Sequence, residues 1–483
     1  MSGLIESIRR EFLREGVRTA RQLAESVDHS QPTISRALAD MGDAVVRIGR
    51  GASTQYGLAA PIESLGSRWP LYVINEAGEP QQLGRLHALA GRAWYLERTS
   101  ADAWESLLGD DFGSGVFPDL PWFLDDTRPQ GFLGRAFARR FGPSMGFPAD
   151  PTRWSSPQVA QALLQHGWDL PGAFVLGMDA LKGAFLSDEP ALVAGQRDRH
   201  FPQLAQAALE GDIVGSSAGG EQPKFTAKVR EGDTIHHVIV KFTGVMTQPE
   251  HQRWADLLAA EHLATEVLAS GGIPAARSRV VDFDGRRFLE VERFDRVGAA
   301  GRRPVVSMRA LDAAFFGEIH TPWTAAADRL ENAGWIRSSD AENLRTLWHF
   351  GELIGNTDMH YGNVSLELSP RRPISLCPVY DMLPMGYRPG HEGRLPESLA
   401  QDPSRTAISD RKARRMATIF WERVVESSLI SGDFRDIARR HLVALEQVER
   451  TMPAFEVERM ESLSEPAARR QDPRTYENRS LGL

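Results

Sequence analysis

The sequence lacks the features that mark several classes of protein. Its 483 residues include one cysteine, Cys377, which excludes an intramolecular disulfide framework and favours a reducing compartment. No apolar run is long enough to span a membrane, and the charged N-terminus has no apolar stretch typical of a secretion signal. The net charge of -8 argues against a surface that binds nucleic acid throughout. We therefore expect a cytoplasmic protein without membrane contact.

The most informative segment is a polar loop after an apolar helix predicted over residues 344–354. It reads Gly-Asn-Thr-Asp-Met-His-Tyr-Gly-Asn from Gly355 to Asn363, and a further carboxylate, Asp381, follows downstream. A phosphotransferase that uses Mg-ATP needs one carboxylate to orient the attacking hydroxyl. It needs a second carboxylate and an amide oxygen to hold Mg²⁺, which prefers oxygen ligands. We interpret Asp358 as the catalytic residue and Asn363 and Asp381 as metal ligands.

Two further features upstream suit a nucleotide site. A loop of small residues precedes a strand, and glycine there lets the backbone approach phosphate oxygens, although such a loop alone is weak evidence. Lys241 ends an apolar strand predicted over residues 236–242, and a strand lysine of this kind pairs with phosphates while a helix glutamate holds it. Glu261 in the following helix is the candidate partner, and Glu266 is the competitor. The loop residues expected around the phosphates are Ser217, Ala218, Gly219, Gly220 and Lys224.

A β-hairpin leads from these elements toward the second half of the chain. An Asp-Gly pair at residues 284–285 separates two apolar runs, which is typical of a two-residue hairpin turn. The second run ends at Glu292 and Phe294, and backbone groups at such a hinge can bind the edge of an adenine. Beyond about residue 324 the pattern becomes mainly helical. A strand-rich lobe followed by a helical lobe is the arrangement of protein kinases, so we expect an α+β, two-lobed, protein-kinase-like fold.

The first 60 residues form a separate pattern. Three short helices are predicted, the third beginning at Ser30 with Pro32 in its first turn, and a small hairpin follows. This order predicts a winged helix-turn-helix, in which the third helix enters the major groove of DNA and the hairpin touches the backbone. Dimerisation or regulation of the neighbouring domain is the alternative role. The residues expected to contact DNA are Gln31, Thr33, Ser35 and Arg36 on the third helix, with Arg47, Arg50 and Gln55 at the wing.

At these motifs the chain resembles the HipA family of serine/threonine kinases, the toxins of bacterial toxin–antitoxin pairs. Four segments carry the resemblance, which is good over about residues 200–400 and weak over 61–200. It is closest to the branch called HipH or YjjJ, whose members carry their own helix-turn-helix. The matching segments read Ser-Ser-Ala-Gly-Gly-Glu-Gln-Pro-Lys (216–224), Val-Glu-Arg-Phe-Asp-Arg (291–296), Gly-Asn-Thr-Asp-Met-His-Tyr-Gly-Asn (355–363) and Val-Tyr-Asp-Met-Leu-Pro (379–384).

The resemblance implies roles that the residues alone do not. It implies autophosphorylation at Ser216 or Ser217, which would place charge where the ATP phosphates bind. It implies a separate antitoxin as the usual partner, although a fused N-terminal unit suggests self-contained regulation. With it, the cofactor-binding set comprises the loop residues above together with Lys241, Glu292, Phe294, His360, Asn363, Tyr380 and Asp381; His360 is expected to stabilise the loop rather than bind metal.

The sequence therefore predicts an ATP- and Mg²⁺-dependent kinase that phosphorylates serine or threonine of a protein and binds DNA through its N-terminus. Two alternatives stay open. One is a transcriptional regulator whose kinase-like region senses a ligand without catalysis, and the other is a nuclease that uses Mg²⁺. The predicted domains are a winged helix-turn-helix (1–60), a HipA N-terminal subdomain (61–150), a small lobe with phosphate loop and hinge (151–323), a helical large lobe (324–465) and a tail (466–483).

Overall fold

The computed structural model describes residues 2–100, 104–186, 190–210, 222–390, 393–399 and 402–464. The small-residue loop that was expected to bind phosphate lies outside these ranges, and so does the predicted tail at residues 466–483. The expectations for Ser216, Ser217, Ala218, Gly219 and Gly220 therefore fall on residues that the structure does not describe, whereas Lys224 is described.

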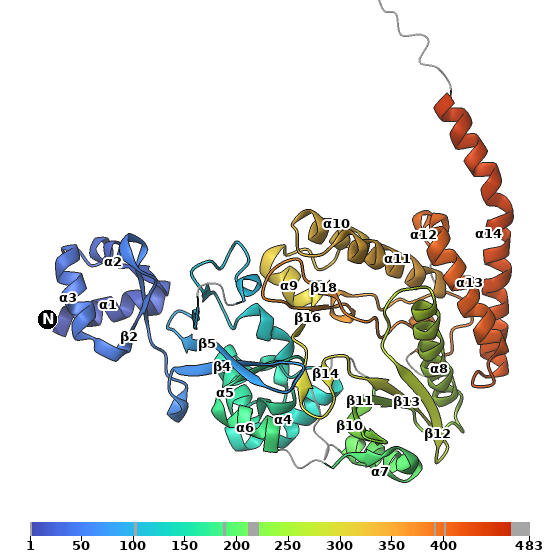
Figure 1. The fold of residues 1–483 in the computed structure, drawn as a ribbon, viewed down its shortest axis with the longest axis horizontal. Coiled ribbons are helices and arrows are strands. Elements are labelled where there is room, and N and C mark those ends of the chain that lie inside the picture. The colour runs from blue at the N-terminus through green and yellow to red at the C-terminus, as the bar shows by residue number, and fades with distance from the viewer. Residues whose placement is uncertain are drawn as a thin grey trace, which may run out of the picture.

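The N-terminal unit lies at one end of the molecule (Figure 1). Its helices and hairpin follow the predicted order, and Thr19 forms a capping box at the start of the second helix. Pro32 lies in the first turn of the third helix, as expected. A small apolar core that includes Phe12, Leu23 and Ile34 holds the unit together. Its elements are α1 (Ser2–Glu15), β1 (Arg18–Thr19), α2 (Ala20–Ser26), α3 (Gln31–Asp40), β2 (Val45–Ile48) and β3 (Gln55–Leu58), with the strands in the order β1-β3-β2.

A five-stranded sheet forms the middle of the chain, in the order β7-β6-β5-β4-β8. Its last strand, β8, pairs with β4 and lies beyond residue 150, where the sequence predicted a domain boundary. The Pro/Gly-rich segment 142–151 ends a helix at Gly146, which has a positive φ, so it is a turn inside this unit. The elements are β4 (Arg68–Ile74), β5 (Pro80–Ala88), β6 (Trp94–Arg98), β7 (Val116–Phe117), α4 (Gly131–Met145), α5 (Ser156–His166), β8 (Phe174–Leu176) and α6 (Met178–Leu186).

A second five-stranded sheet follows, in the order β12-β13-β11-β10-β9. Asp284 and Gly285 both have positive φ between β12 and β13, which is the two-residue hairpin turn that the Asp-Gly pair predicted. The helix predicted to end before Gly271 does so. The elements are β9 (Leu192–Val193), α7 (Arg197–Glu210), β10 (Lys224–Glu231), β11 (Thr234–Phe242), α8 (Pro249–Ser270), β12 (Ser278–Phe283) and β13 (Arg286–Glu292).

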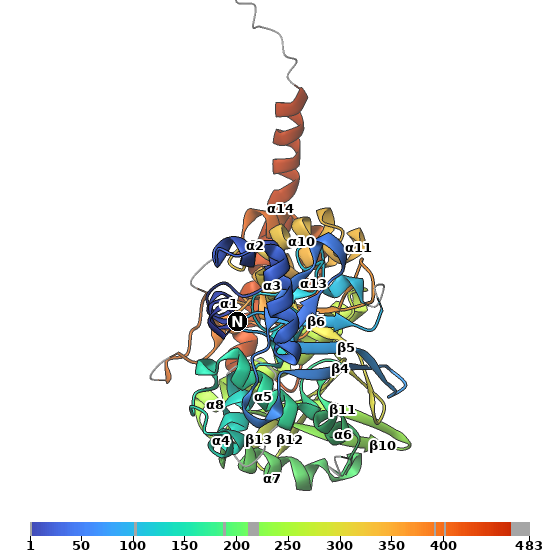
Figure 2. The ribbon, with the colours of Figure 1, turned by 90° about the vertical axis from the view of Figure 1, so that its left-hand side faces the viewer.

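The rest of the chain is mainly helical, as the sequence predicted, with a small sheet that flanks the polar loop. The last helix, α14, extends away from the body of the molecule (Figures 1 and 2). None of the helices in the described ranges is long and apolar enough to cross a membrane. The elements are β14 (Arg296–Val297), β15 (Gly301–Arg302), β16 (Val305–Ser307), α9 (Met308–Phe315), α10 (Trp323–Asn332), α11 (Ser338–Ile354), β17 (Ser365–Glu367), β18 (Ser375–Leu376), α12 (Arg405–Ser409), α13 (Arg411–Glu426) and α14 (Gly432–Ser464).

One apolar core joins the middle sheet to the helical region. Trp122, which precedes α4, packs edge to face against Phe315 of α9 and Trp335 after α10, with ring centroids 5.3 and 6.1 Å apart. The same core includes Leu71 of β4 and Phe350 of α11. Because α11 delivers the polar loop, the middle sheet forms part of the scaffold that positions that loop.

Candidate functional site

Lys241 lies at the centre of a buried charged cluster. It occupies the end of β11, between β10 and β13, and only 7% of its surface is exposed. Its Nζ lies 2.6 Å from Oε1 and 2.7 Å from Oε2 of Glu261 on α8, and it also forms an ion pair with Asp381. Glu266, the alternative partner, binds Arg423 instead. The structure thus selects Glu261 and adds Asp381, which lies 140 residues away in sequence.

The charges in this cluster stabilise one another. Burial alone would lower the pKa of Lys241, but the carboxylates of Asp381 and Glu261 outweigh it and hold that pKa above its usual value. Burial would raise the pKa of Asp381, but Lys241 and Lys224 hold it below its usual range. Burial raises the pKa of Glu261, against the attraction of Lys241. The ammonium of Lys241 and the carboxylate of Asp381 are therefore both charged at neutral pH.

Lys224 brings a second ammonium group to the same place. It is the Cα partner of Lys241 across the β10–β11 ladder, and directly opposed residues project on the same face of a sheet. Lys224 is buried, and its charge acts on both Glu261 and Asp381. The first residue of β10 and the end of β11 therefore bring two buried cations together.

The polar loop that contains Asp358 is fixed by its own amides. Oδ1 of Asn356 accepts a hydrogen bond from the Asp358 backbone at 3.0 Å, and Nδ2 of Asn363 donates to the Asp358 carbonyl at 2.9 Å. Nδ1 of His360 accepts from the Gly362 N–H at 3.0 Å, which supports the prediction that this imidazole stabilises the loop. The Asp358 carboxylate remains 46% exposed, so a substrate can reach it.

Tyr380 ties this loop to the segment that carries Asp381. Its hydroxyl donates to the Gly362 carbonyl at 3.0 Å and lies 2.8 Å from the Ser365 hydroxyl. The next residue, Asp381, has a φ of +53°, a left-handed conformation that is uncommon for a residue with a side chain. Backbone strain of this kind is concentrated at functional sites, because the surrounding structure must hold it in place.

In the hinge after β13, the backbone and the Glu292 side chain face different surroundings. The Arg293 N–H donates to the His237 carbonyl at 2.8 Å, and the ring of Phe294 lies 5.6 Å from that of Tyr380. Residues alternate between the faces of a strand, and Lys241 is paired with Leu289, so the Glu292 side chain projects on the opposite face from Lys241. Only the backbone of Glu292 is therefore placed to contact a ligand beside Lys241.

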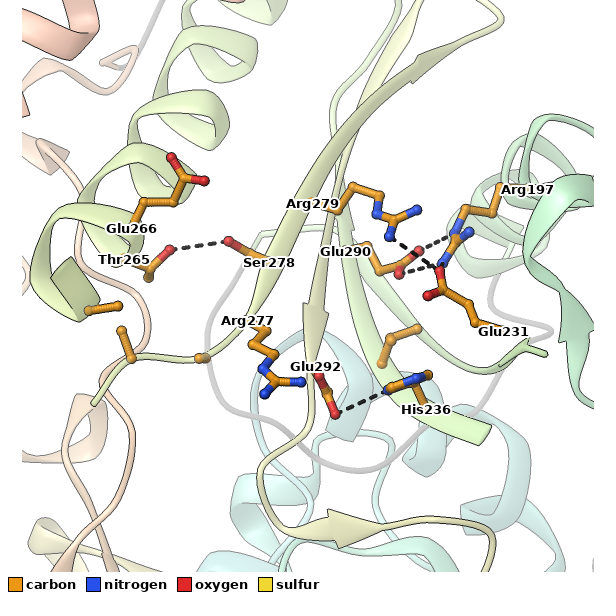
Figure 3. Close-up of a pocket in the computed structure, with 14 residues that line it drawn as sticks. Arg197, Glu231, His236, Thr265, Glu266, Arg277, Ser278, Arg279, Glu290 and Glu292 are labelled. Atoms are coloured by element: carbon orange, nitrogen blue, oxygen red, sulfur yellow. Dashed lines mark hydrogen bonds and ion pairs between the residues drawn. The ribbon is translucent and has the colours of Figure 1, made fainter. Parts of the chain in front are cut away.

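The Glu292 side chain instead lines a pocket of about 430 Å³ between α7, α8 and the sheet (Figure 3). His236 lies 3.2 Å from Glu292, and an ion pair between Arg197 and Glu290 closes the other side at 2.6 Å. Basic and acidic side chains alternate along this wall and neutralise one another. The ion pair between Arg197 and Glu290 thus links α7 to the outer face of the sheet.

A buried ionic network that the sequence analysis did not identify supports the hinge. Asp295 accepts from Arg293 at 2.9 Å and from Arg296 at 2.6 Å, and both arginines also reach Asp169, which follows α5. Burial would raise the pKa of Asp295, but the two arginines hold it far below its usual range. The segment Val-Glu-Arg-Phe-Asp-Arg contains three of these groups, but no sequence pattern pointed to the fourth, Asp169.

The N-terminal unit presents the residues expected to contact DNA. Gln31, Ser35 and Arg36 on α3 are exposed, as is Arg50 between β2 and β3, whereas Thr33 is half-buried. Thr33 is also engaged locally, since its hydroxyl lies 2.8 Å from that of Ser30. The exposed side chains therefore leave one face of α3 accessible to a partner.

Two regions of this chain match the models of known protein families. Residues 65–185 match the model of the YjjJ-like toxin middle domain, and residues 216–455 match the HipA-like C-terminal domain. Toxin YjjJ of Escherichia coli (strain K12) is 36% identical over 444 residues, which covers 91% of this chain and 97% of that protein. The middle-domain match ends at residue 185, so it includes β8, in agreement with the sheet.

A solved structure shares the fold. HipA of Shewanella oneidensis MR-1, solved in a complex with HipB and its operator DNA, superimposes with a TM-score of 0.53. The alignment covers 79% of this chain and 97% of that chain, at 16% sequence identity. At this identity the likeness concerns the arrangement of helices and strands, and the chemistry must be argued from the residues themselves.

Proposed function

This chain belongs to the HipA family of toxins, and from that premise we propose that it is a protein kinase that uses ATP and Mg²⁺ to phosphorylate serine or threonine. The observation that carries the proposal is the buried contact of Lys241 with both Glu261 and Asp381. A strand lysine held by a helix glutamate beside a metal-binding aspartate is the arrangement that kinases use to bind nucleotide phosphates.

The donor atoms of the site suit Mg-ATP. Nδ2 of Asn363 donates to the Asp358 carbonyl, so Oδ1 of Asn363 is the atom available to a cation, together with the Asp381 carboxylate. Lys241 and Lys224 would attract the phosphates, and the Phe294–Tyr380 pair would pack against the adenine. The bound metal would neutralise charge that develops on the phosphates during transfer.

We propose Asp358 as the catalytic residue. Its carboxylate is accessible while its backbone is held by Asn356 and Asn363, so a substrate hydroxyl could be oriented without loss of loop geometry. Autophosphorylation of Ser216 or Ser217 would add a negative group that competes with the ATP phosphates for Lys224 and Lys241. We propose this as the means by which the kinase is switched off.

Labelling with γ-labelled ATP and Mg²⁺ tests the kinase proposal. We expect the wild type to label itself, and we expect Asp358→Ala and Asp381→Ala to lose labelling. Asp436→Ala on α14 is the control, since Asp436 is exposed and pairs with Arg439 on the same helix. Labelling that survives both site variants would refute the assignment. Nucleotide binding without any labelling by the wild type would favour the ligand-sensing regulator, and cleavage of supercoiled DNA without ATP would favour the nuclease.

We also propose that the N-terminal unit is a winged helix-turn-helix that binds DNA. The exposed polar face of α3 and the cationic Arg50 at the hairpin turn support this function. Arg36→Gln should relax the preference for one DNA sequence over others. Arg50→Gln should weaken binding to all sequences and reduce the magnitude of the slope of log affinity against log salt concentration by about one, because one fewer counterion is released. Lys412→Gln, on α13, is the control of equal charge. Unchanged binding in both N-terminal variants would contradict the proposal.

The partners follow from these two activities. The substrate would be a protein with an accessible serine or threonine hydroxyl. HipA of Shewanella oneidensis was solved with HipB and operator DNA, and we propose that an antitoxin can bind this chain as well. The fused N-terminal unit would then provide a DNA contact within the same polypeptide.

A further inference from the structure

A second cavity, of about 250 Å³, lies between the middle unit and the sheet that carries Lys241. One wall comes from α4 and the turn after α5, and the other from β10, β11 and the β14–β15 hairpin. Four cationic side chains and a single carboxylate line it, together with two imidazoles and several aromatic rings. The charged and imidazole residues are Arg140, His166, Asp169, Lys228, His237, Arg296 and Arg302.

Part of the positive charge of this cavity has no acidic partner among the described residues, although Arg296 is paired with Asp295. Asp169 is shared by Arg293 and Arg296. Within the described ranges, no carboxylate lies within ion-pair distance of Arg302 or Lys228, and the buried Arg302 donates to the Trp168 carbonyl at 2.5 Å. Burial and the nearby Arg296 lower the pKa of Arg302 to about 9. An unpaired buried guanidinium is costly, and an anionic ligand would offset that cost.

The opposite wall offers a flat surface and an unused polar atom. The His166 ring stacks on Phe141 with centroids 4.0 Å apart, and Trp168 meets it edge to face at 5.6 Å. Nδ1 of His166 is buried and has no hydrogen-bond partner in the part of the chain that the structure describes. Burial and the neighbouring Arg140 lower the pKa of His166, so the ring is neutral at physiological pH. A neutral imidazole can donate to or accept from a ligand.

This cavity is separate from the proposed ATP phosphate site. Lys228 lies four residues beyond Lys224 on β10, and His237 lies four residues from Lys241 on β11. With a strand rise of about 3.3 Å per residue, the two sites are about 13 Å apart on the same face of the sheet. The backbone carbonyl of His237 accepts a hydrogen bond from the Arg293 N–H, so the cavity adjoins the hinge.

We propose that this cavity binds a small phosphate monoester, with the phosphate on Lys228 and Arg302 and the attached group against His166 and Trp168. The ligand class follows from the excess of cations on one wall and the planar aromatic surface on the other. A free mononucleotide and a phosphorylated amino acid share this chemistry, and the arms of the experiment separate them. The proposal does not depend on catalysis, because it rests on residues outside the proposed active site.

Calorimetry on the full chain tests the proposal, with inorganic phosphate, O-phosphoserine and AMP as probes. A non-hydrolysable ATP analogue and Mg²⁺ are present in excess to fill the nucleotide site. We expect at least one monoester to bind more tightly than inorganic phosphate, and the tighter of the two identifies the source. Lys228→Gln and Arg302→Gln should each weaken binding by about tenfold or more, as expected for loss of a charge-assisted hydrogen bond.

Lys412→Gln, which removes the same charge on α13, should leave the affinity unchanged. Binding that is unaffected by Lys228→Gln, or that falls equally in Lys412→Gln, would overturn the proposal. If Arg302→Gln does not fold, Lys228→Gln decides, because Lys228 is only half-buried and its replacement leaves no buried charge unpaired. Self-labelling measured on the same samples reports separately on the kinase.

Discussion

The two five-stranded sheets of this protein use the same architecture for different purposes. The middle sheet is apolar on both faces, with Trp69 and Leu71 packed in the large core and Tyr72 and Ile74 packed against α6. The sheet of β9 to β13 packs Phe225, Val240 and Phe288 of its outer face against Phe201 of α7, and Glu290 on the same face pairs with Arg197. Its other face carries buried charges, among them Lys241.

This difference separates a scaffold from the surface that we propose binds ATP. Apolar burial on two faces stabilises a sheet at no electrostatic cost. Buried lysines opposite buried carboxylates cost desolvation and add little net stability, so a chain that keeps them has another use for them. We therefore expect substitutions in the two sheets to separate stability from activity.

The largest effect is expected at Lys241. Lys241→Met should abolish self-labelling, by more than about a hundredfold, and should lower the free energy of unfolding by about 3–5 kcal/mol because Glu261 and Asp381 are left unpaired. Urea denaturation and labelling on the same samples measure the two effects. The double variant Lys241→Met, Glu261→Gln should recover part of the stability and none of the activity. Recovery of labelling in the double variant would show that the lysine is structural.

The next effect concerns the scaffold. Leu71→Ala should lower the free energy of unfolding by about 2–5 kcal/mol, because the Leu71 side chain is fully buried and its truncation leaves a cavity. Labelling per folded molecule should be unchanged. Leu13→Ala on α1, where the side chain is 62% exposed, is the control and should change stability by less than about 0.5 kcal/mol. If labelling per folded molecule fell together with stability in Leu71→Ala, the two sheets would not differ in the way proposed.

Features of the fold and the candidate site could be predicted from the sequence where the interacting residues lie close together along the chain. The Asp284–Gly285 turn and the end of α8 at Gly271 depend on local backbone preferences, and both were predicted. Pairing of Lys241 with a helix glutamate was predicted because it joins neighbouring elements, although two candidates stayed open. The Asp169 contacts join residues more than 120 positions apart, and no local pattern encodes them.

The boundary predicted at residue 150 does not coincide with the end of the middle sheet, for a related reason. A Pro/Gly-rich stretch marks a turn, but whether the turn joins two helices of one unit or two units depends on strand pairing downstream. Here β8 returns to pair with β4 after α5, so residues 151–185 belong to the middle sheet. The polar loop could be singled out from the sequence because its residue types and spacing are those that the proposed phosphoryl transfer needs.

A third effect tests the junction between the sheets. Asp295→Asn should lower the free energy of unfolding by about 2–3 kcal/mol at pH 7, because Arg293 and Arg296 lose a shared carboxylate. The pKa of Asp295 is depressed in the folded state, so its contribution is complete above the unfolded pKa of about 3.9 and is lost as pH falls below it. The difference in the free energy of unfolding between wild type and variant should therefore be constant from pH 8 to 5 and become smaller at lower pH. A constant gap at pH 3 would contradict the ionic explanation.

The smallest effect compares one histidine from each sheet. Burial lowers the pKa of both His237 on β11 and His87 on β5. Arg293 and Arg296 lower the pKa of His237 further, whereas Glu97, 3.1 Å from His87, acts to raise the pKa of that ring. The pKa of His237 falls to about 4, so the folded state resists a proton that the unfolded chain takes up near pH 6.5. Folding is therefore penalised as pH falls from 7 toward 4. His237→Gln should reduce the stability lost between pH 7 and 5 by about 2 kcal/mol, and His87→Gln should reduce it by less. Thermal unfolding of both variants across this range measures the difference, and equal changes would show that the cationic surroundings of His237 do not act on its titration.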